Sequence, residues 1–118
     1  MEKAKMAAVL SASTLTGDKV KNLAGEELGK IEDLVIDLKS GRVAYAVVSF
    51  GGGFMHGGKL FAIPWASLAV DQGDKKIILN VPREKLETAE GFDKDHWPDM
   101  ANPDFFQRTY AYYGVQPW

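Results

Sequence analysis

The chain contains no cysteine among its 118 residues, which excludes disulfide bonds, thiol catalysis and cysteine-bound zinc. It also lacks a basic excess. The chain has 14 Lys and Arg residues and 16 Asp and Glu residues, and the resulting net charge of −2 argues against direct nucleic-acid binding. The longest apolar run near the start, residues 6–10, is too short for a signal peptide or a membrane span. We therefore expect a cytoplasmic protein that does not span a membrane.

What is present is an ordinary globular composition, with 46% hydrophobic and 25% charged residues. A chain of this length suits a single core. We divide it into an N-terminal extension (1–12), a barrel domain (13–98) and a C-terminal aromatic tail (99–118).

Short β-strand patterns occupy most of the barrel domain. The expected strands are Lys19–Leu23, Gly29–Leu38, Arg42–Phe50, Leu60–Ile63, Ala69–Asp71 and Lys75–Val81. Short strands at close spacing, without long helices between them, predict a mainly β fold: a small antiparallel β-barrel with short C-terminal helices. The predicted core residues are Val20, Ile31, Val47, Phe61, Ile63, Ile77 and Leu79.

Two strands carry unusual patterns. The alternation of apolar and polar residues along the strand Gly29–Leu38 is interrupted at Glu32–Asp33, which predicts a β-bulge there. The strand Arg42–Phe50 is apolar on both faces, with Val43, Tyr45 and Val47 on one face and Ala44, Ala46, Val48 and Phe50 on the other. Because a barrel has only one interior, the second face must be covered by a terminal segment or by a second subunit.

The last third of the chain has helical signals. Pro82 can begin a short helix that runs to Glu87, with Leu86 facing inward. Asn102 is placed to cap a final helix that Gly114 ends. Aromatic side chains recur along one face of this helix, at Phe106, Tyr110 and Tyr113.

The glycine-rich segment Gly51–Gly58 matches a phosphate-binding loop only in part. Gly53, Gly58 and Lys59 fit G-x-x-x-x-G-K, but Leu60 stands where Ser or Thr would bind magnesium. A strand rather than a helix is expected after Lys59. We therefore interpret the segment as a connection between strands and expect no bound cofactor.

Other candidates for chemistry are weak. His56 and His96 lie far apart, and His96 with Asp93, Asp95 and Asp99 only resembles a metal site by composition. The carboxylates of Glu32, Asp33 and Asp37 have no enclosing cleft, and Ser49 and Ser67 have no nucleophile context. We predict neither a catalytic residue nor a metal site. The acidic stretch from Glu84 to Asp104 favours a solvated face, or else a surface for a basic partner.

One family fits the order of the motifs. Gly29–Asp37, Gly41–Val48, Gly52–Phe54 and Lys59–Trp65 together resemble the PRC-barrel domain, and the resemblance covers roughly residues 13–98. Similar domains occur in the photosynthetic reaction-centre H subunit and in the ribosome maturation factor of the small subunit. The resemblance implies a small barrel that serves assembly or partner docking and supplies no catalytic residues.

We therefore predict a non-enzymatic binding or assembly module that self-associates as a homodimer. The final helix either packs on its own barrel or crosses to a neighbour, and we favour the crossing. Two alternatives stay open: an RNA-processing or ribosome-assembly accessory acting through protein contacts, and a small-ligand-binding protein that uses the glycine-rich segment. The candidate interface residues are Tyr45, Phe54, Met55, Trp65, Phe106, Tyr110 and Tyr113.

Overall fold

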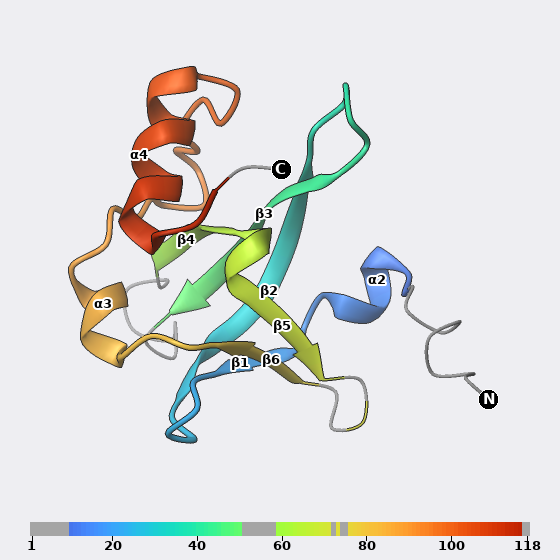
Figure 1. Ribbon diagram of the computed structural model, residues 1–118, viewed down its shortest axis with the longest axis vertical. Coiled ribbons are helices and arrows are strands. Elements are labelled where there is room, and N and C mark those ends of the chain that lie inside the picture. The colour runs from blue at the N-terminus through green and yellow to red at the C-terminus, as the bar shows by residue number, and fades with distance from the viewer. Residues whose placement is uncertain (1–9, 51–58, 72, 74–75, 117–118) are drawn as a thin grey trace.

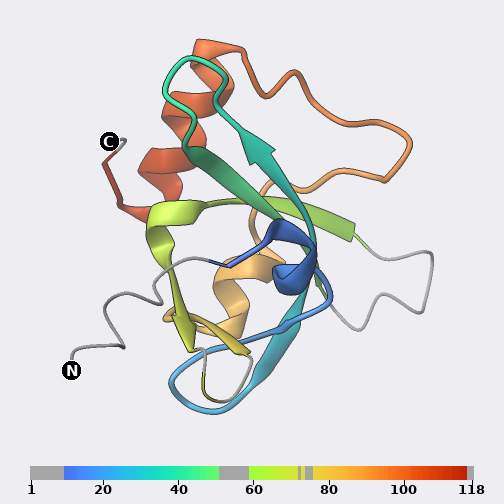
Figure 2. The same cartoon turned by 90° about the vertical axis from the view of Figure 1, so that its right-hand side faces the viewer.

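A computed structural model describes residues 10–50, 59–71, 73 and 76–116 of the chain. These residues form a six-stranded sheet in the order β4-β3-β2-β1-β6-β5. The sheet curls, and its two edge strands, β4 and β5, are joined in sequence by the 3-10 turn η1 (Figures 1 and 2). The predicted mainly β, barrel-like fold is confirmed.

The observed elements follow the expected ones closely. They are α2 (Ala12–Leu15), β1 (Lys19–Lys21), β2 (Glu27–Ile36), β3 (Val43–Phe50), β4 (Lys59–Pro64), η1 (Trp65–Ser67), β5 (Leu68–Asp71), β6 (Lys76–Leu79), α3 (Arg83–Glu87) and α4 (Pro103–Tyr113). As expected, a strand and not a helix begins at Lys59.

One strand pair differs from the prediction. We expected antiparallel strands throughout, but β1 and β6 run parallel, with Val20 opposite Ile77. The other four pairs of neighbouring strands are antiparallel. The sequence pattern could not reveal this, because a strand buried on one face has the same alternation whatever the direction of its neighbour.

The long β2–β3 hairpin is shaped by two local features. Pairing with β3 shifts register between Ile31 and Asp33, which confirms the predicted bulge. At the turn, the Asp37 carboxylate accepts hydrogen bonds from the backbone nitrogen of Ser40 (3.0 Å) and from its hydroxyl (2.6 Å). Gly41 follows with φ +75°, a conformation that favours glycine. Figure 1 shows that the tip of this hairpin projects beyond the other strands of the sheet.

Apolar packing occurs on both faces of β3. All seven predicted core residues are buried. The barrel interior holds Ala46 and Val48 of β3, together with Leu86 of α3. A second cluster lies on the outer face and joins β3 and β4 to α4; its buried members are Ala44, Tyr45, Ala62, Phe105 and Tyr110. The second face of β3 is thus covered by a terminal segment of the same chain. Ala44 packs with this outer cluster, unlike the other residues assigned to its face.

Candidate docking groove

Helix α4 begins and ends where the sequence indicates. The Asn102 side chain accepts a hydrogen bond from the backbone nitrogen of Asp104 (2.8 Å), and Pro103 occupies the first turn. Gly114 ends the helix with φ +70°. The Tyr112 hydroxyl donates to the carbonyl of Lys85 (2.5 Å), which attaches α4 to α3. The helix is therefore fixed at its ends by local capping and along its length by contacts within the chain.

Tyr45 of β3 is the centre of the contact between α4 and the sheet. Its ring meets those of Phe105, Phe106 and Tyr110 edge-on, with centroid separations of 5.8, 5.9 and 5.8 Å. Such edge-to-face pairs stabilise packing beyond the area that they bury. Helix α4 thus packs on the barrel of its own chain, which is one of the two arrangements that the sequence left open. The stripe on this helix is therefore already partnered, which removes the basis for the expected crossing to a neighbour.

The two buried tyrosine hydroxyls have different surroundings. The Tyr110 hydroxyl donates to the carbonyl oxygen of Ala44 at 2.7 Å. The Tyr45 hydroxyl is buried and has no hydrogen-bond partner among the described residues. Burial raises the pKa of Tyr45 well above its ordinary value, and the neighbouring Tyr110 adds to the rise. Tyr45 is therefore a neutral phenol at physiological pH.

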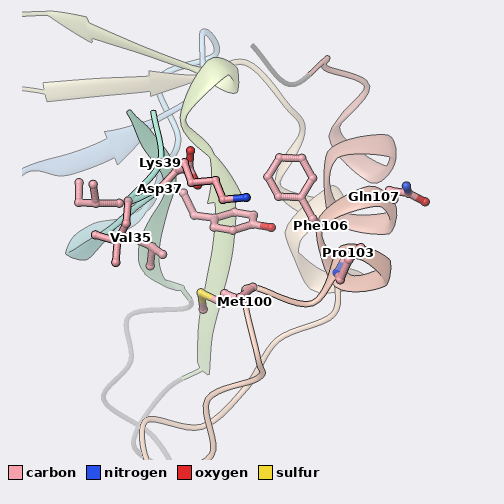
Figure 3. A pocket seen from close by; sticks show the side chains of 12 residues that line it. Val35, Asp37, Lys39, Met100, Pro103, Phe106 and Gln107 are labelled. Atoms are coloured by element: carbon pink, nitrogen blue, oxygen red, sulfur yellow. The ribbon is translucent and has the colours of Figure 1, made fainter. Parts of the chain in front are cut away.

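A groove of about 600 Å³ opens between the β2–β3 hairpin and α4. In Figure 3, Val35, Asp37 and Lys39 lie on one side and Pro103 and Phe106 on the other, with Met100 between them; Gln107 also lines the groove, although most of its side chain points away from the hairpin. The remaining lining residues are Ile36, Leu38, Ala44, Tyr45 and Ala101. This volume lies within the range of about 300–1,000 Å³ that is typical of ligand pockets, and most of the lining side chains are apolar.

The apolar surface continues from the groove onto the hairpin turn. Leu38 is 91% exposed and Ile36 is 45% exposed, and both also line the groove. A single exposed leucine is common on protein surfaces, but apolar residues that border an apolar hollow are typical of a docking surface.

Two charged side chains line the groove, Asp37 and Lys39, and both belong to its hairpin side. Hydrogen bonds from Ser40 lower the pKa of Asp37, so this carboxylate is held ionised within the turn. The lining residues on the side of α4 carry no formal charge, so the charges of the groove lie on its hairpin side.

A smaller hollow of about 180 Å³ lies on the other side of α4. At its rim, Arg108 donates two hydrogen bonds to the Glu90 carboxylate (2.9 and 3.0 Å). This pairing lowers the pKa of Glu90. Both side chains are more than half exposed, so the ion pair contributes little to stability. It joins α4 to the segment that follows α3.

The structure places several of the side chains that were considered for metal binding or catalysis. Among the described residues, no three His, Cys, Asp or Glu side chains gather as a metal site would require. His96 Nδ1 lies 3.9 Å from an Asp93 carboxylate oxygen, and both side chains are largely exposed. The Ser49 hydroxyl donates to the Lys30 carbonyl. No helix in the described part of the chain is both long and apolar enough to cross a membrane.

The candidate interface residues separate into three groups. Tyr45 and Phe106 line the groove. Tyr110 of α4 is buried against the sheet, whereas Tyr113 and Trp65 pack against the barrel core. Phe54 and Met55, with the whole segment Gly51–Gly58, lie outside the described residues.

The sequence interpretation missed most of the groove. Val35, Ile36, Leu38 and Met100 come together only because the hairpin and α4 lie side by side. One signal was available in advance: Leu38 is an apolar residue in a turn that is otherwise polar.

The two tyrosines allow a matched test. We expect Tyr110→Phe to lower the free energy of unfolding by about 1–2 kcal/mol, since the buried Ala44 carbonyl loses its donor. Tyr45→Phe should leave stability unchanged or raise it, because it removes a buried hydroxyl without a partner. Urea unfolding of both variants measures the difference. Equal destabilisation by the two substitutions would contradict this assignment.

Comparison with known proteins places the chain in a family. The family model of the PRC-barrel domain matches residues 8–86. A search of curated proteins gives no significant match. Among solved structures, the chain is similar to the crystal structure of a 16S ribosomal RNA processing protein, RimM, from Pseudomonas aeruginosa, at 15% identity and a TM-score of 0.48. That alignment covers 71% of this chain and 50% of that one, so this chain spans about half its length. On the match over residues 8–86, the chain belongs to the PRC-barrel domain family.

Proposed function

We propose that the chain is a non-enzymatic binding module and that the groove between the β2–β3 hairpin and α4 is its docking surface. The observation that carries the proposal is the apolar hollow of about 600 Å³ bordered by the exposed side chains of Ile36 and Leu38. Burying such side chains against a partner is favourable in proportion to the apolar area removed from water.

The walls of the groove suit binding rather than chemistry. Its described lining residues include Tyr45, which stays protonated, and one carboxylate, Asp37, which accepts a hydrogen bond from the Ser40 hydroxyl. Neither group is placed to accept a proton from a bound molecule. The side chains that remain offer apolar contact area, with charge at the rim, which is the composition of a protein-docking surface.

An apolar fluorescent dye, 8-anilinonaphthalene-1-sulfonate, tests whether the groove accepts an apolar occupant. With the protein at about 1 µM, we expect enhanced dye fluorescence from the native chain. Ala101→Trp should remove most of the enhancement, because Ala101 is exposed and lines the groove. The matched control is Ala66→Trp, which places the same side chain at an exposed position in η1 away from the groove.

Circular dichroism must show that both variants are folded. No enhancement from the native chain, or equal enhancement from the two tryptophan variants, would overturn the groove as the docking surface.

A further inference from the structure

Met100 is the sulfur-containing side chain of the groove. The chain has four methionines and no cysteine, so thioethers are its only sulfur groups. Met1, Met6 and Met55 lie outside the described residues, which leaves Met100 as the single sulfur-containing residue in the part of the chain that the structure describes. Oxidation of sulfur in this part of the chain would therefore occur at the groove.

Met100 lies between the two sides of the groove. Figure 3 shows its side chain between Val35 of the hairpin and Pro103 of α4. The side chain packs, partly buried, against the cluster that joins β3 and β4 to α4. Because it is only partly buried, a small oxidant in water can reach it. Because most of the other lining side chains are apolar, a polar group at this position would interrupt the apolar surface of the groove.

The turn that carries Met100 is held by local hydrogen bonds. An Asp99 carboxylate oxygen accepts from the backbone nitrogen of Ala101 (3.1 Å), and the Asp99 carbonyl accepts from the backbone nitrogen of Asn102 (3.1 Å). Neither hydrogen bond involves the thioether. Oxidation of the sulfur therefore leaves this turn in place and changes the polarity of the groove rather than its framework.

Oxidation converts a thioether into a sulfoxide. The sulfur gives an electron pair to an oxygen of a hydroperoxide, the O–O bond breaks, and water leaves when the oxidant is hydrogen peroxide. The sulfoxide oxygen accepts hydrogen bonds from water, and an apolar occupant that covers it cannot replace them. Methionine sulfoxide reductases reverse the step, since the oxygen leaves as water while two thiols form a disulfide.

We propose that Met100 is a reversible oxidation site and that its sulfoxide lowers the affinity of the groove for apolar partners. Hydroperoxide thus controls docking at this surface. The inference rests on the groove being the docking surface. It concerns the chemical state of the groove, so the same loss of affinity is expected for any occupant that covers Met100 with apolar atoms.

Treatment of the full chain with hydrogen peroxide, followed by catalase, tests the site. Peptide mapping by mass spectrometry measures the sulfoxide fraction at each methionine, and 8-anilinonaphthalene-1-sulfonate measures apolar binding. We expect the dye enhancement to fall at least about threefold when Met100 is fully oxidised. The fall should follow the sulfoxide fraction at Met100 and not that at Met1, Met6 or Met55. Methionine sulfoxide reductases with dithiothreitol should restore the enhancement.

Three variants locate the effect, and each is compared with itself before and after treatment. Met100→Leu retains an apolar side chain of similar volume without a thioether, so peroxide should not change its enhancement. Met6→Leu removes a thioether outside the described residues and should respond to peroxide as the native chain does. Met100→Gln places a polar side chain in the groove, so without any oxidant it should give less enhancement than Met100→Leu.

Each outcome has one meaning. A native chain that binds the dye equally before and after complete oxidation of Met100 overturns the proposal and leaves the groove as the docking surface. An equal fall in Met100→Leu, or loss of the native circular dichroism spectrum on oxidation, also overturns it. An untreated native chain that binds no dye overturns the proposed function, and the regulation with it.

Discussion

Removal of residues 102–118 is expected to abolish cooperative folding. The deletion takes away α4, whose buried Phe105 and Tyr110 cover the outer face of β3 and β4. It would expose Tyr45 and Ala44 of β3 and Ala62 of β4 to water, although these strands already bury their other face in the barrel core. Loss of one buried Phe costs about 3–5 kcal/mol, and whole domains are stable by only about 5–15 kcal/mol. Thermal unfolding followed by circular dichroism is the measurement.

A point substitution separates the packing contribution from the effects of truncation. Phe105→Ala should lower the free energy of unfolding by about 3–5 kcal/mol, because the side chain is buried against Tyr45. Gln107→Ala, an exposed position on the same helix, should change it by less than about 0.5 kcal/mol. A truncated chain that remains soluble and unfolds cooperatively would show that the barrel does not need α4.

Gly29→Ala is expected to be the most damaging small substitution. Gly29 lies in β2 opposite Phe50 of β3, and a Cβ at this position would overlap the backbone carbonyl of Ser49. A backbone atom within a paired strand cannot move aside without breaking the ladder, so the two longest strands must separate locally. We expect destabilisation of more than about 3 kcal/mol, beyond the usual range for point substitutions.

Gly73→Ala provides the control for Gly29→Ala. The nearest atom to a Cβ at Gly73 is an Asp71 carboxylate oxygen at 3.5 Å, which is ordinary contact. The free energy of unfolding of this variant, measured in urea, should lie within about 0.5 kcal/mol of that of the native chain. Comparable stability of the two alanine variants would contradict the close approach of β2 and β3.

Local signals in the sequence were sufficient to predict the helices and strands and the residues of the barrel core. Asn102 and Gly114 mark the ends of α4 because capping depends on hydrogen bonds within a few residues. The bulge at Glu32–Asp33 was readable because one inserted residue interrupts the alternation of apolar side chains. The core positions Val20 and Ile77 followed from the same alternation.

Only the tertiary structure decided which long-range neighbours meet. The two apolar faces of β3 required a second cover, but the sequence was equally compatible with a terminal segment and with another subunit. The ring contacts of Tyr45 with Phe105 and Tyr110 show that α4 of the same chain supplies it. The parallel pairing of β1 with β6 and the groove between Leu38 and Met100 were likewise invisible in the sequence. Alternation and capping record what each segment buries and where it ends, whereas the identity of a distant partner depends on the path of the whole chain.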